Sequence, residues 1–397
     1  MKIDNYRLIA DGLMPLSRLS QPKEVIRQFT PNWFAATMGT GILAIALSAL
    51  PHKHESIYSI GESLWKFNIA LFLTFLFLYS ARWLLYFNEA RRIFRHSVVS
   101  MFFGCIPMGL STIINGFVIY GPNILGETAN IIALNLWYVD AVLAIACGVA
   151  IPFMMFTHQQ HAIEKMTAVW LLPVVASEVA AVSAGMIAPK IADSHDQLIV
   201  LISGFVLWAC SVPLAMSILS ILLLRMILHK LPEAGMAATS WLSLGPIGTG
   251  ALALLTLGEA TPNIFESNGL EIFIPGIQGF YFIAVILLWG YGLWWLLIAT
   301  AITIRHFQGH VPFNLGWWGY TFPLGVYAVT TLRIYKVMPI EAFAIIGGSL
   351  TAVLSVLWLI VGSRTIRGAW QGDLFVSPCL KDLVQEPQPS MNTSLDE

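Results

Sequence analysis

The stretch WWGYTFPLGVYAVTT, Trp317 to Thr331, has the apolar composition of a membrane-spanning helix, yet it contains Pro323 and Gly325. Proline removes one backbone hydrogen bond and glycine exposes the backbone, and lipid cannot replace what is lost. Such an interruption is therefore expected to face other protein or a water-filled cavity. Similar interruptions recur along the chain, and their spacing decides the predicted fold.

The composition of the chain is that of a membrane protein with several spans. Of 397 residues, 57% are hydrophobic and 11% are charged, and the mean hydropathy is +0.74. Soluble domains average about 45–50% apolar and about 25% charged residues. The net charge is -1 and there is no basic run, so nucleic acid is not an expected partner. The expected surroundings are a lipid bilayer.

Ten apolar runs are long enough to cross about 30 Å of hydrocarbon. They are predicted at 29–50, 63–87, 98–120, 130–156, 167–188, 197–228, 237–258, 273–304, 315–335 and 340–363. The sequence thus predicts an all-α polytopic membrane protein whose ten-helix transport domain covers 29–364. An N-terminal segment (1–28) and a C-terminal tail (365–397) flank it. The tail from Gly372 onward is polar and contains proline, and we predict it to be mobile.

The distribution of Lys and Arg predicts the orientation in the membrane. If both termini lie on one side, that side carries fifteen of these residues and the other side five, with Arg82 inside the second run. Because cytoplasmic loops are enriched in positive residues, both termini are predicted to be cytoplasmic. The first 28 residues lack an apolar core, so no cleavable signal is expected.

Helix-weakening residues recur in the odd-numbered runs. They occur in PNWFAATMGTG (31–41), GCIPMGLST (104–112), LLPVVASEVAAVSAG (171–185), GPIGTGA (245–251) and FPLG (322–325). The even-numbered runs are mostly uninterrupted, with Pro152 and Pro213 as exceptions. This alternation predicts five helical hairpins around a central pore, with the interrupted helices inside and the others against lipid. The alternative is that glycine and proline only let membrane helices pack closely.

Small and hydroxyl-bearing residues of the interrupted runs are the predicted lining of an anion path. Hydroxyls and backbone amide dipoles can attract an anion weakly enough to release it. Alternatively, each hydroxyl bonds to its own helix or to a neighbouring helix. The predicted lining residues are Thr37, Gly39, Thr40, Gly41, Pro107, Gly109, Ser111, Pro173, Ser177, Gly245, Pro246, Gly248, Thr249 and Pro323.

Phe322, beside Pro323, is the candidate gate of this path. An aromatic ring beside a proline can swing with little backbone movement, and it closes a path by excluding water. The alternative is an ordinary core aromatic.

Glu178 is the most informative charge inside the predicted membrane region. Such residues face the protein interior and have partners. Because an ionised carboxylate would repel an anion, Glu178 is expected either in a buried ion pair or as a protonated group that couples anion movement to protons. Asp140 is expected to be a structural partner outside the ring, and Arg82 is expected to snorkel to the membrane surface.

No other chemistry has a comparable pattern. HQQH (158–161) lacks a third metal ligand, and GPIGTG has no preceding strand to make it a nucleotide loop. Neither a metal nor a cofactor is therefore expected. An intramembrane enzyme would need acids or histidines converging at one depth, which the sequence does not provide. A purely structural membrane protein would not need five interrupted helices.

Five segments resemble the tellurite-resistance/dicarboxylate transporter family. They are FTPNWFAATMGTGIL (29–43), FFGCIPMGLSTIIN (102–115), LLPVVASEVAAVSAG (171–185), LGPIGTGALALL (244–255) and NLGWWGYTFPLGVYA (314–328). The family includes bacterial tellurite-resistance channels, plant slow anion channels, fungal malate permeases and fungal sulfite efflux pumps. LLPVV, GPIGTG and FPLG are most similar to the sulfite efflux branch.

The resemblance implies ten helices in five hairpins, a homotrimer with one path per subunit, and an aromatic plug at Phe322. With the features above, it predicts a carrier or channel of the cytoplasmic membrane for small anions. Sulfite or a C4-dicarboxylate such as malate is the expected cargo. Whether transport is channel-like or coupled to protons through Glu178 stays open at this point.

Overall fold

The computed structural model describes residues 14–51 and 54–381. The first part of the predicted N-terminal segment and the last part of the predicted tail, residues 1–13 and 382–397, lie outside these ranges. Within the described ranges all regular secondary structure is helical, and there is no β-strand. The predicted all-α class is confirmed.

Nine helices in the described residues are long and apolar enough to cross a membrane. They are Pro31–Ala49, Glu55–Leu85, Val99–Ile119, Thr128–Thr157, Ala168–Lys190, Ser194–His229, Ala234–Glu266, Glu271–Phe307 and Glu341–Gln371. In the place of the ninth predicted run, the structure has a 3₁₀ segment, η9 (Leu315–Tyr320), and a helix of 16 residues, α13 (Phe322–Val337). A multi-pass helical membrane protein is confirmed, and the number of ten spans remains a prediction.

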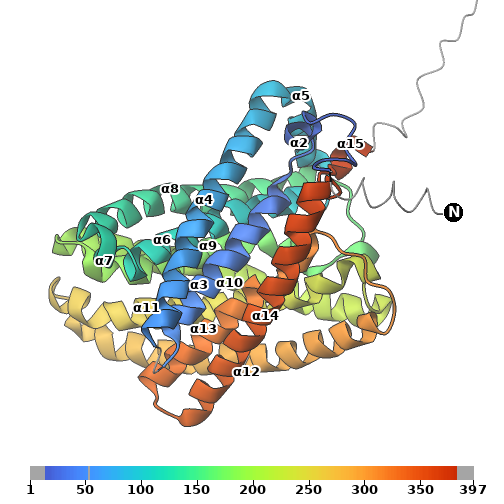
Figure 1. Ribbon diagram of the computed structural model, residues 1–397. Helices are drawn as coiled ribbons and strands as arrows, with labels where there is room; N and C mark the ends of the chain where they lie inside the picture. The colour runs from blue at the N-terminus through green and yellow to red at the C-terminus, as the bar shows by residue number, and fades with distance from the viewer. Residues whose placement is uncertain (1–13, 52–53, 382–397) are drawn as a thin grey trace, which may run out of the picture.

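Five helices form a closed ring in which each packs against two others. In ring order, these inner helices are α3 (Ala35–Ala49), α6 (Cys105–Ile119), α9 (Leu172–Ile187), α11 (Leu244–Glu266) and α13. Each inner helix also packs against the long helix that follows it in the chain. These outer helices are α4 (Glu55–Leu85), α8 (Thr128–Thr157), α10 (Ser194–His229), α12 (Ile274–Phe307) and α14 (Glu341–Gln371) (Figure 1). This is the predicted arrangement of five hairpins.

Burial separates the two sets of helices. In the most apolar 18-residue window of each candidate span, 67–94% of residues are buried in the inner helices and 17–39% in the outer helices. The outer helices expose large apolar side chains, among them Phe77, Val142, Leu287 and Leu359. Exposed apolar surface of this extent suits contact with lipid rather than water.

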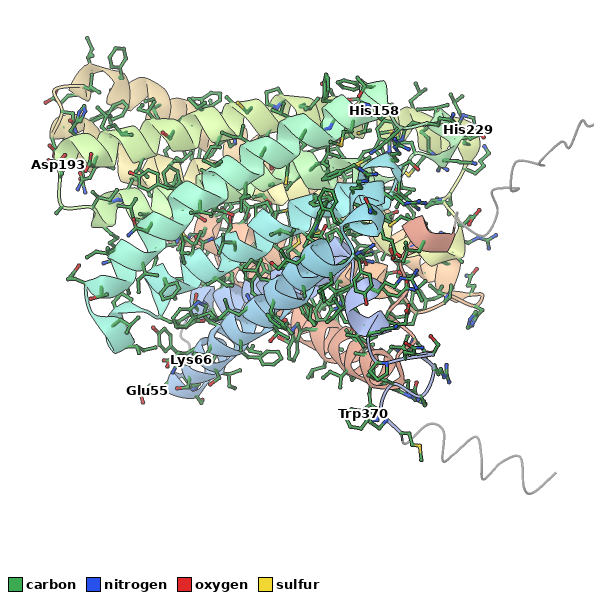
Figure 2. All side chains as sticks on the ribbon, turned by 90° about the horizontal axis from the view of Figure 1, so that it is seen from above. Glu55, Lys66, His158, Asp193, His229 and Trp370 are labelled. Carbon is green, nitrogen blue, oxygen red and sulfur yellow. The ribbon has the colours of Figure 1, made fainter. Side chains whose placement is uncertain are left out.

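The connections between helices lie at two opposite ends of the bundle. Glu55, Lys66 and Asp193 lie toward one end, whereas His158, His229 and Trp370 lie toward the other (Figure 2). Glu55 and Asp193 lie where outer helices begin, after connections from inner helices, and Lys66 lies within the first half of α4. His158, His229 and Trp370 lie where outer helices end. We call these the Asp193 end and the His158 end.

One tryptophan of each outer helix donates a hydrogen bond to the inner helix of the next hairpin. These five indole struts are Trp65 to the Ile113 carbonyl, Trp137 to the Ala180 carbonyl, Trp208 to the Gly250 carbonyl, Trp289 to Thr331 Oγ1 and Trp358 to Thr40 Oγ1. The donor–acceptor distances are 2.9–3.1 Å. The strut from Trp358 connects the last hairpin to the first, so the struts run round the whole ring.

Each inner helix is preceded by a 3₁₀ segment. Besides η9, which precedes α13, these segments are η1 (Pro31–Phe34), η3 (Val99–Gly104), η5 (Ala168–Leu171) and η7 (Ala234–Ser243). Four prolines that we expected in mid-span, Pro107, Pro173, Pro246 and Pro323, fall within the first three residues of the α-helices that follow. The first amides of a helix have no intrahelical acceptor, so a proline there removes little. The inner helices therefore change from 3₁₀ to α geometry at this depth instead of bending in the middle.

The two ends of the described chain meet beside α4, where Figure 1 shows α2 (Glu24–Arg27), α5 (Phe87–Ala90) and α15 (Pro378–Lys381) together. The buried Arg82 guanidinium donates to the Phe29 carbonyl and to Ser377 Oγ. Phe375 stacks on Trp33 with ring centroids 4.9 Å apart. Arg82 thus joins the two chain ends.

These contacts correct two predictions. Arg82 does not snorkel to the surface, because its partners are buried protein groups. Residues 372–380 are packed rather than mobile, because Phe375 stacks on Trp33 and Leu374 packs against the hydrophobic core. In addition, α14 continues to Gln371, beyond the predicted domain boundary at residue 364.

Candidate functional site

A cavity of about 470 Å³ occupies the centre of the ring, and we call it the large cavity. All five inner helices contribute to its wall, for example through Ile42, Asn115, Val179, Thr249 and Val326. It extends to the connection between α3 and α4, at the Asp193 end of the bundle.

A second cavity of about 370 Å³ continues the large cavity at the Asp193 end, and we call it the mouth cavity. The two cavities share Arg333 and Lys336. Arg333 forms an ion pair with Glu259 at 2.8 Å, and the Lys336 ammonium lies 3.9 Å from the same carboxylate. With Lys190 also in the lining, three cations face one carboxylate, so the mouth has a positive balance that favours anions.

A third cavity, of about 40 Å³, lies at the start of the inner helices, and we call it the narrow cavity. Its walls are mostly apolar and include Met38, Met108, Leu172 and Leu242. This volume holds at most a few water molecules, which excludes a hydrated ion.

Phe322 is the one described residue that lines both the large cavity and the narrow cavity. It is the first residue of α13, it precedes Pro323, and its side chain is 3% exposed. The phenyl group of Phe322 therefore lies between the two cavities. The predicted role of Phe322 as a gate requires this position, and the movement of its phenyl group remains a prediction.

The α-helical parts of the inner helices begin around Phe322. Their first residues are Ala35, Cys105, Leu172, Leu244 and Phe322. Unpaired amides and the positive end of the helix dipole lie at a helix N-terminus. Here, however, the first amides at Ala35, Cys105, Leu172 and Leu244 each donate to a carbonyl of the preceding 3₁₀ segment, so these four starts offer no free amide to the constriction.

The predicted lining residues divide into two groups. Thr249 lines the large cavity, and Gly245 and Pro323 line the narrow cavity. The other residues line none of these three cavities; they are Thr37, Gly39, Thr40, Gly41, Pro107, Gly109, Ser111, Pro173, Ser177, Pro246 and Gly248.

Several of this second group allow neighbouring helices to approach closely. A Cβ atom added to Gly39 would lie 2.6 Å from the Trp318 ring, and one added to Gly109 would lie 2.3 Å from Thr37 Oγ1. The Thr37 hydroxyl donates to the Phe34 carbonyl of its own chain segment, at 2.7 Å. These residues thus have the packing and back-bonding roles that were the alternative to a place in the lining.

Glu178 is fully buried between α9 and α10 and lines none of the three cavities. Its Oε1 atom lies 2.8 Å from Ser211 Oγ, and that hydroxyl also lies 2.8 Å from the Val174 carbonyl oxygen. Ser211 has one proton to donate, and neither a carbonyl nor an ionised carboxylate can donate. Both contacts are therefore hydrogen bonds at the same time only when Glu178 carries a proton.

Glu178 forms no ion pair with any residue in 14–51 or 54–381, so the expected buried ion pair is absent from the described structure. Asp140 is likewise fully buried, and it accepts a hydrogen bond from Ser111 across the α6–α8 hairpin. Asp140 therefore has the structural partner that was predicted.

Asn115 is a cavity residue that the sequence reasoning did not identify. It lies one helical turn beyond Thr112, and both line the large cavity. An amide side chain in an apolar run, three residues after another polar residue, could have indicated a shared face.

Comparison with known proteins gives the following relationships. Residues 28–366 match the family described as voltage-dependent anion channel, SLAC1. The sulfite efflux pump SSU1 of Arthroderma benhamiae is 37% identical over 356 residues, which cover 88% of this chain and 93% of the relative. The malic acid transport protein of Schizosaccharomyces pombe is 22% identical over 376 residues, covering 93% and 84%. The sulfite efflux pump SSU1 of Saccharomyces cerevisiae is 24% identical over 397 residues, covering 84% and 86%.

These relatives confirm the predicted resemblance, which included malate permeases and sulfite efflux pumps. They are transport proteins, and the expectation of a transporter rather than an enzyme is confirmed with them.

Proposed function

Because the chain belongs to the voltage-dependent anion channel family SLAC1, a family of anion transport proteins, we propose that it moves sulfite across a membrane through its ring of inner helices. The observation that carries this proposal is the pair of cavities on the ring axis. All five hairpins contribute to both cavities, and among the residues that the structure describes Phe322 alone lines both.

The proposed path runs along the axis of the ring. At the His158 end an anion meets the apolar narrow cavity, which is too small for a hydrated ion, so the anion must lose water there. Phe322 closes the path at this point, because an apolar constriction that excludes water also excludes ions. When the phenyl group of Phe322 moves aside, the anion enters the large cavity and then reaches the cations of the mouth cavity.

Sulfite is the first choice of cargo, and malate is the second. A relative at 37% identity is named for sulfite efflux, whereas the relative named for malic acid is 22% identical. None of the described residues that line the narrow cavity carries a positive charge. This also favours a small anion, because a dicarboxylate would have to lose water from two charged groups there.

Coupling to protons is the second mechanism that a specific observation favours. The Glu178–Ser211–Val174 contacts form a complete set of hydrogen bonds only with a protonated carboxyl group. Release of that proton would leave a buried charge beside α10 and α11, which links the protonation of Glu178 to the packing of the ring.

A transport assay on the purified chain in lipid vesicles tests the proposal. Uptake of radiolabelled sulfite, malate and chloride is measured with and without a pH gradient. We expect sulfite uptake well above that of protein-free vesicles. Sulfite uptake no faster than in protein-free vesicles would refute the proposed function.

A further inference from the structure

Two polar side chains of the large cavity form no hydrogen bond with any described residue. Thr249, on α11, is fully buried, and Asn115, on α6, is 4% exposed. Both residues line the cavity, and neither Thr249 Oγ1 nor Asn115 Oδ1 has a partner. Buried polar groups in proteins are nearly always paired, so these two require a ligand or water.

The other hydroxyls at this face of the cavity are already used. Thr112 Oγ1 donates to the Gly109 carbonyl at 2.7 Å and accepts from Asn68 at 3.1 Å. Thr256 Oγ1 donates to the Ala253 carbonyl at 3.1 Å. Of the thirteen buried side-chain atoms without a partner in the described residues, only those of Asn115 and Thr249 belong to this lining.

Resting on the proposed function, we propose that Asn115 and Thr249 bind the transported anion on the mouth side of Phe322. The Thr249 hydroxyl donates its proton and the Asn115 carboxamide donates through its N–H groups, while the unpartnered Asn115 Oδ1 accepts from the O–H group of a protonated anion. The two residues stand on non-adjacent helices of the ring, so the anion lies on the axis of the path between them. Neutral donors hold an anion without trapping it, which transport requires.

The ligand class that fits is a small oxyanion with one negative charge. The charged residues of this lining are Arg333 and Lys336, both at the mouth, and Arg333 is already paired with Glu259. Two neutral donors can compensate one charge, whereas the second carboxylate of a dicarboxylate would be left without a partner. Hydrogensulfite, the singly protonated form of sulfite, meets this requirement.

The test compares variants of the full chain in vesicles, with sulfite uptake measured at mildly acidic pH. We expect Thr249→Val and Asn115→Leu each to raise the half-saturation concentration about tenfold or more, since hydrogen bonds to charged groups are the strong ones. Thr249→Ser retains the hydroxyl and should stay within about twofold of the wild type. The matched control is Thr261→Val, because Thr261 is buried on the same helix, lines none of the three cavities and donates to the Leu257 carbonyl at 2.8 Å.

A binding measurement separates this inference from the proposed function. A ligand that binds the folded state raises its melting temperature. In detergent, sodium hydrogensulfite should raise the melting temperature of the wild type but not the melting temperature of the Thr249→Val/Asn115→Leu variant. Sodium malate at equal ionic strength should raise the melting temperature of neither protein.

If the wild type transports sulfite while both single variants behave like Thr261→Val, the cavity atoms bind water only and the inference is wrong. If malate stabilises the wild type as much as hydrogensulfite does, the ligand class is wrong. No sulfite transport by the wild type would refute the proposed function itself.

Discussion

Glu178 is a buried carboxyl group whose neighbours are a hydroxyl and a carbonyl oxygen rather than a cation. Glutamine has the shape of a protonated glutamate and can also donate to Ser211. A folded Glu178→Gln variant is therefore expected, because it preserves the hydrogen-bond pattern that the structure indicates.

The Glu178→Gln variant also tests proton coupling. If Glu178 must be protonated, wild-type sulfite flux should fall as the pH rises and the carboxyl group ionises. The variant cannot ionise, so its flux should stay level over the same pH range. The measurement is initial uptake into vesicles at several pH values, with sulfite supplied at a fixed concentration of its singly charged form. An unchanged pH response in the variant would leave Glu178 with a structural role only.

Single residues also show where sequence reasoning reached its limit. Thr40 and Thr249 occupy the same GTG pattern, in MGTG (38–41) and IGTG (247–250). Thr249 lines the large cavity, whereas Thr40 accepts the indole strut from Trp358. The residue pattern alone cannot give the rotation of each helix about its own axis, and this rotation decides which face meets the cavity.

At the scale of elements, the indole struts join neighbouring hairpins through the same kind of bond. Trp358 and Thr40 connect α14 to α3 and so join residues 318 positions apart in the chain. The other four struts join each outer helix to the next inner helix along the chain. The Trp358 strut is therefore the one that closes the ring between its first and last hairpins.

Removing this strut should weaken the closure of the ring. Trp358→Phe keeps an aromatic ring and loses the donor, so we expect it to lower the free energy of unfolding by about 1 kcal/mol. Thermal unfolding in detergent measures the effect. Trp294→Phe is the matched control, because Trp294 lies on an outer helix and is 42% exposed. Equal melting temperatures for the two variants would show that the strut contributes nothing to closure.

The order and pairing of the helices could be predicted from sequence, because the alternation of interrupted and uninterrupted runs follows from what lipid can tolerate. The position of the break within each inner helix could not be predicted from the sequence. A proline such as Pro323 is compatible with a mid-helix kink or with the first turn of a helix, and the sequence does not distinguish them. The structure selects the first turn, so the α-helix N-terminus lies beside Phe322.

At the scale of the whole molecule, the uneven distribution of Lys and Arg predicts that the His158 end lies in the cytoplasm. Reporter fusions before Met1 and after Glu397 should both report cytoplasm, and a cysteine in place of Glu55 should react with an impermeant reagent from outside. The fusion after Glu397 preserves the packed residues 372–380. A reporter on the opposite side at either terminus would exclude this orientation.

We also propose a homotrimer, as the resemblance implies. The native mass of the protein in detergent or in lipid nanodiscs should correspond to three chains of 43.8 kDa each, after subtraction of bound lipid. Each subunit has its own ring and its own cavities, so transport per chain should not depend on a path between subunits. A stable single-chain particle with full transport activity would contradict a functional need for the trimer.

The central claim is that Phe322 closes an anion path through the ring. Phe322→Ala truncates the side chain that, within residues 14–51 and 54–381, is shared by the large and narrow cavities. Sulfite flux per folded molecule should therefore rise above the wild type, with Phe322→Leu in between. For an ordinary core phenylalanine, the same change costs about 3–5 kcal/mol in soluble proteins and lowers the yield of folded protein without raising flux.

Tyr320→Ala is the matched control, because Tyr320 is equally buried and lines neither cavity. The deciding measurement is sulfite uptake into vesicles, normalised to detergent-stable protein, for the wild type and for both alanine variants. We predict higher uptake for Phe322→Ala and no gain for Tyr320→Ala. Uptake by Phe322→Ala equal to or below that of the wild type would contradict the account.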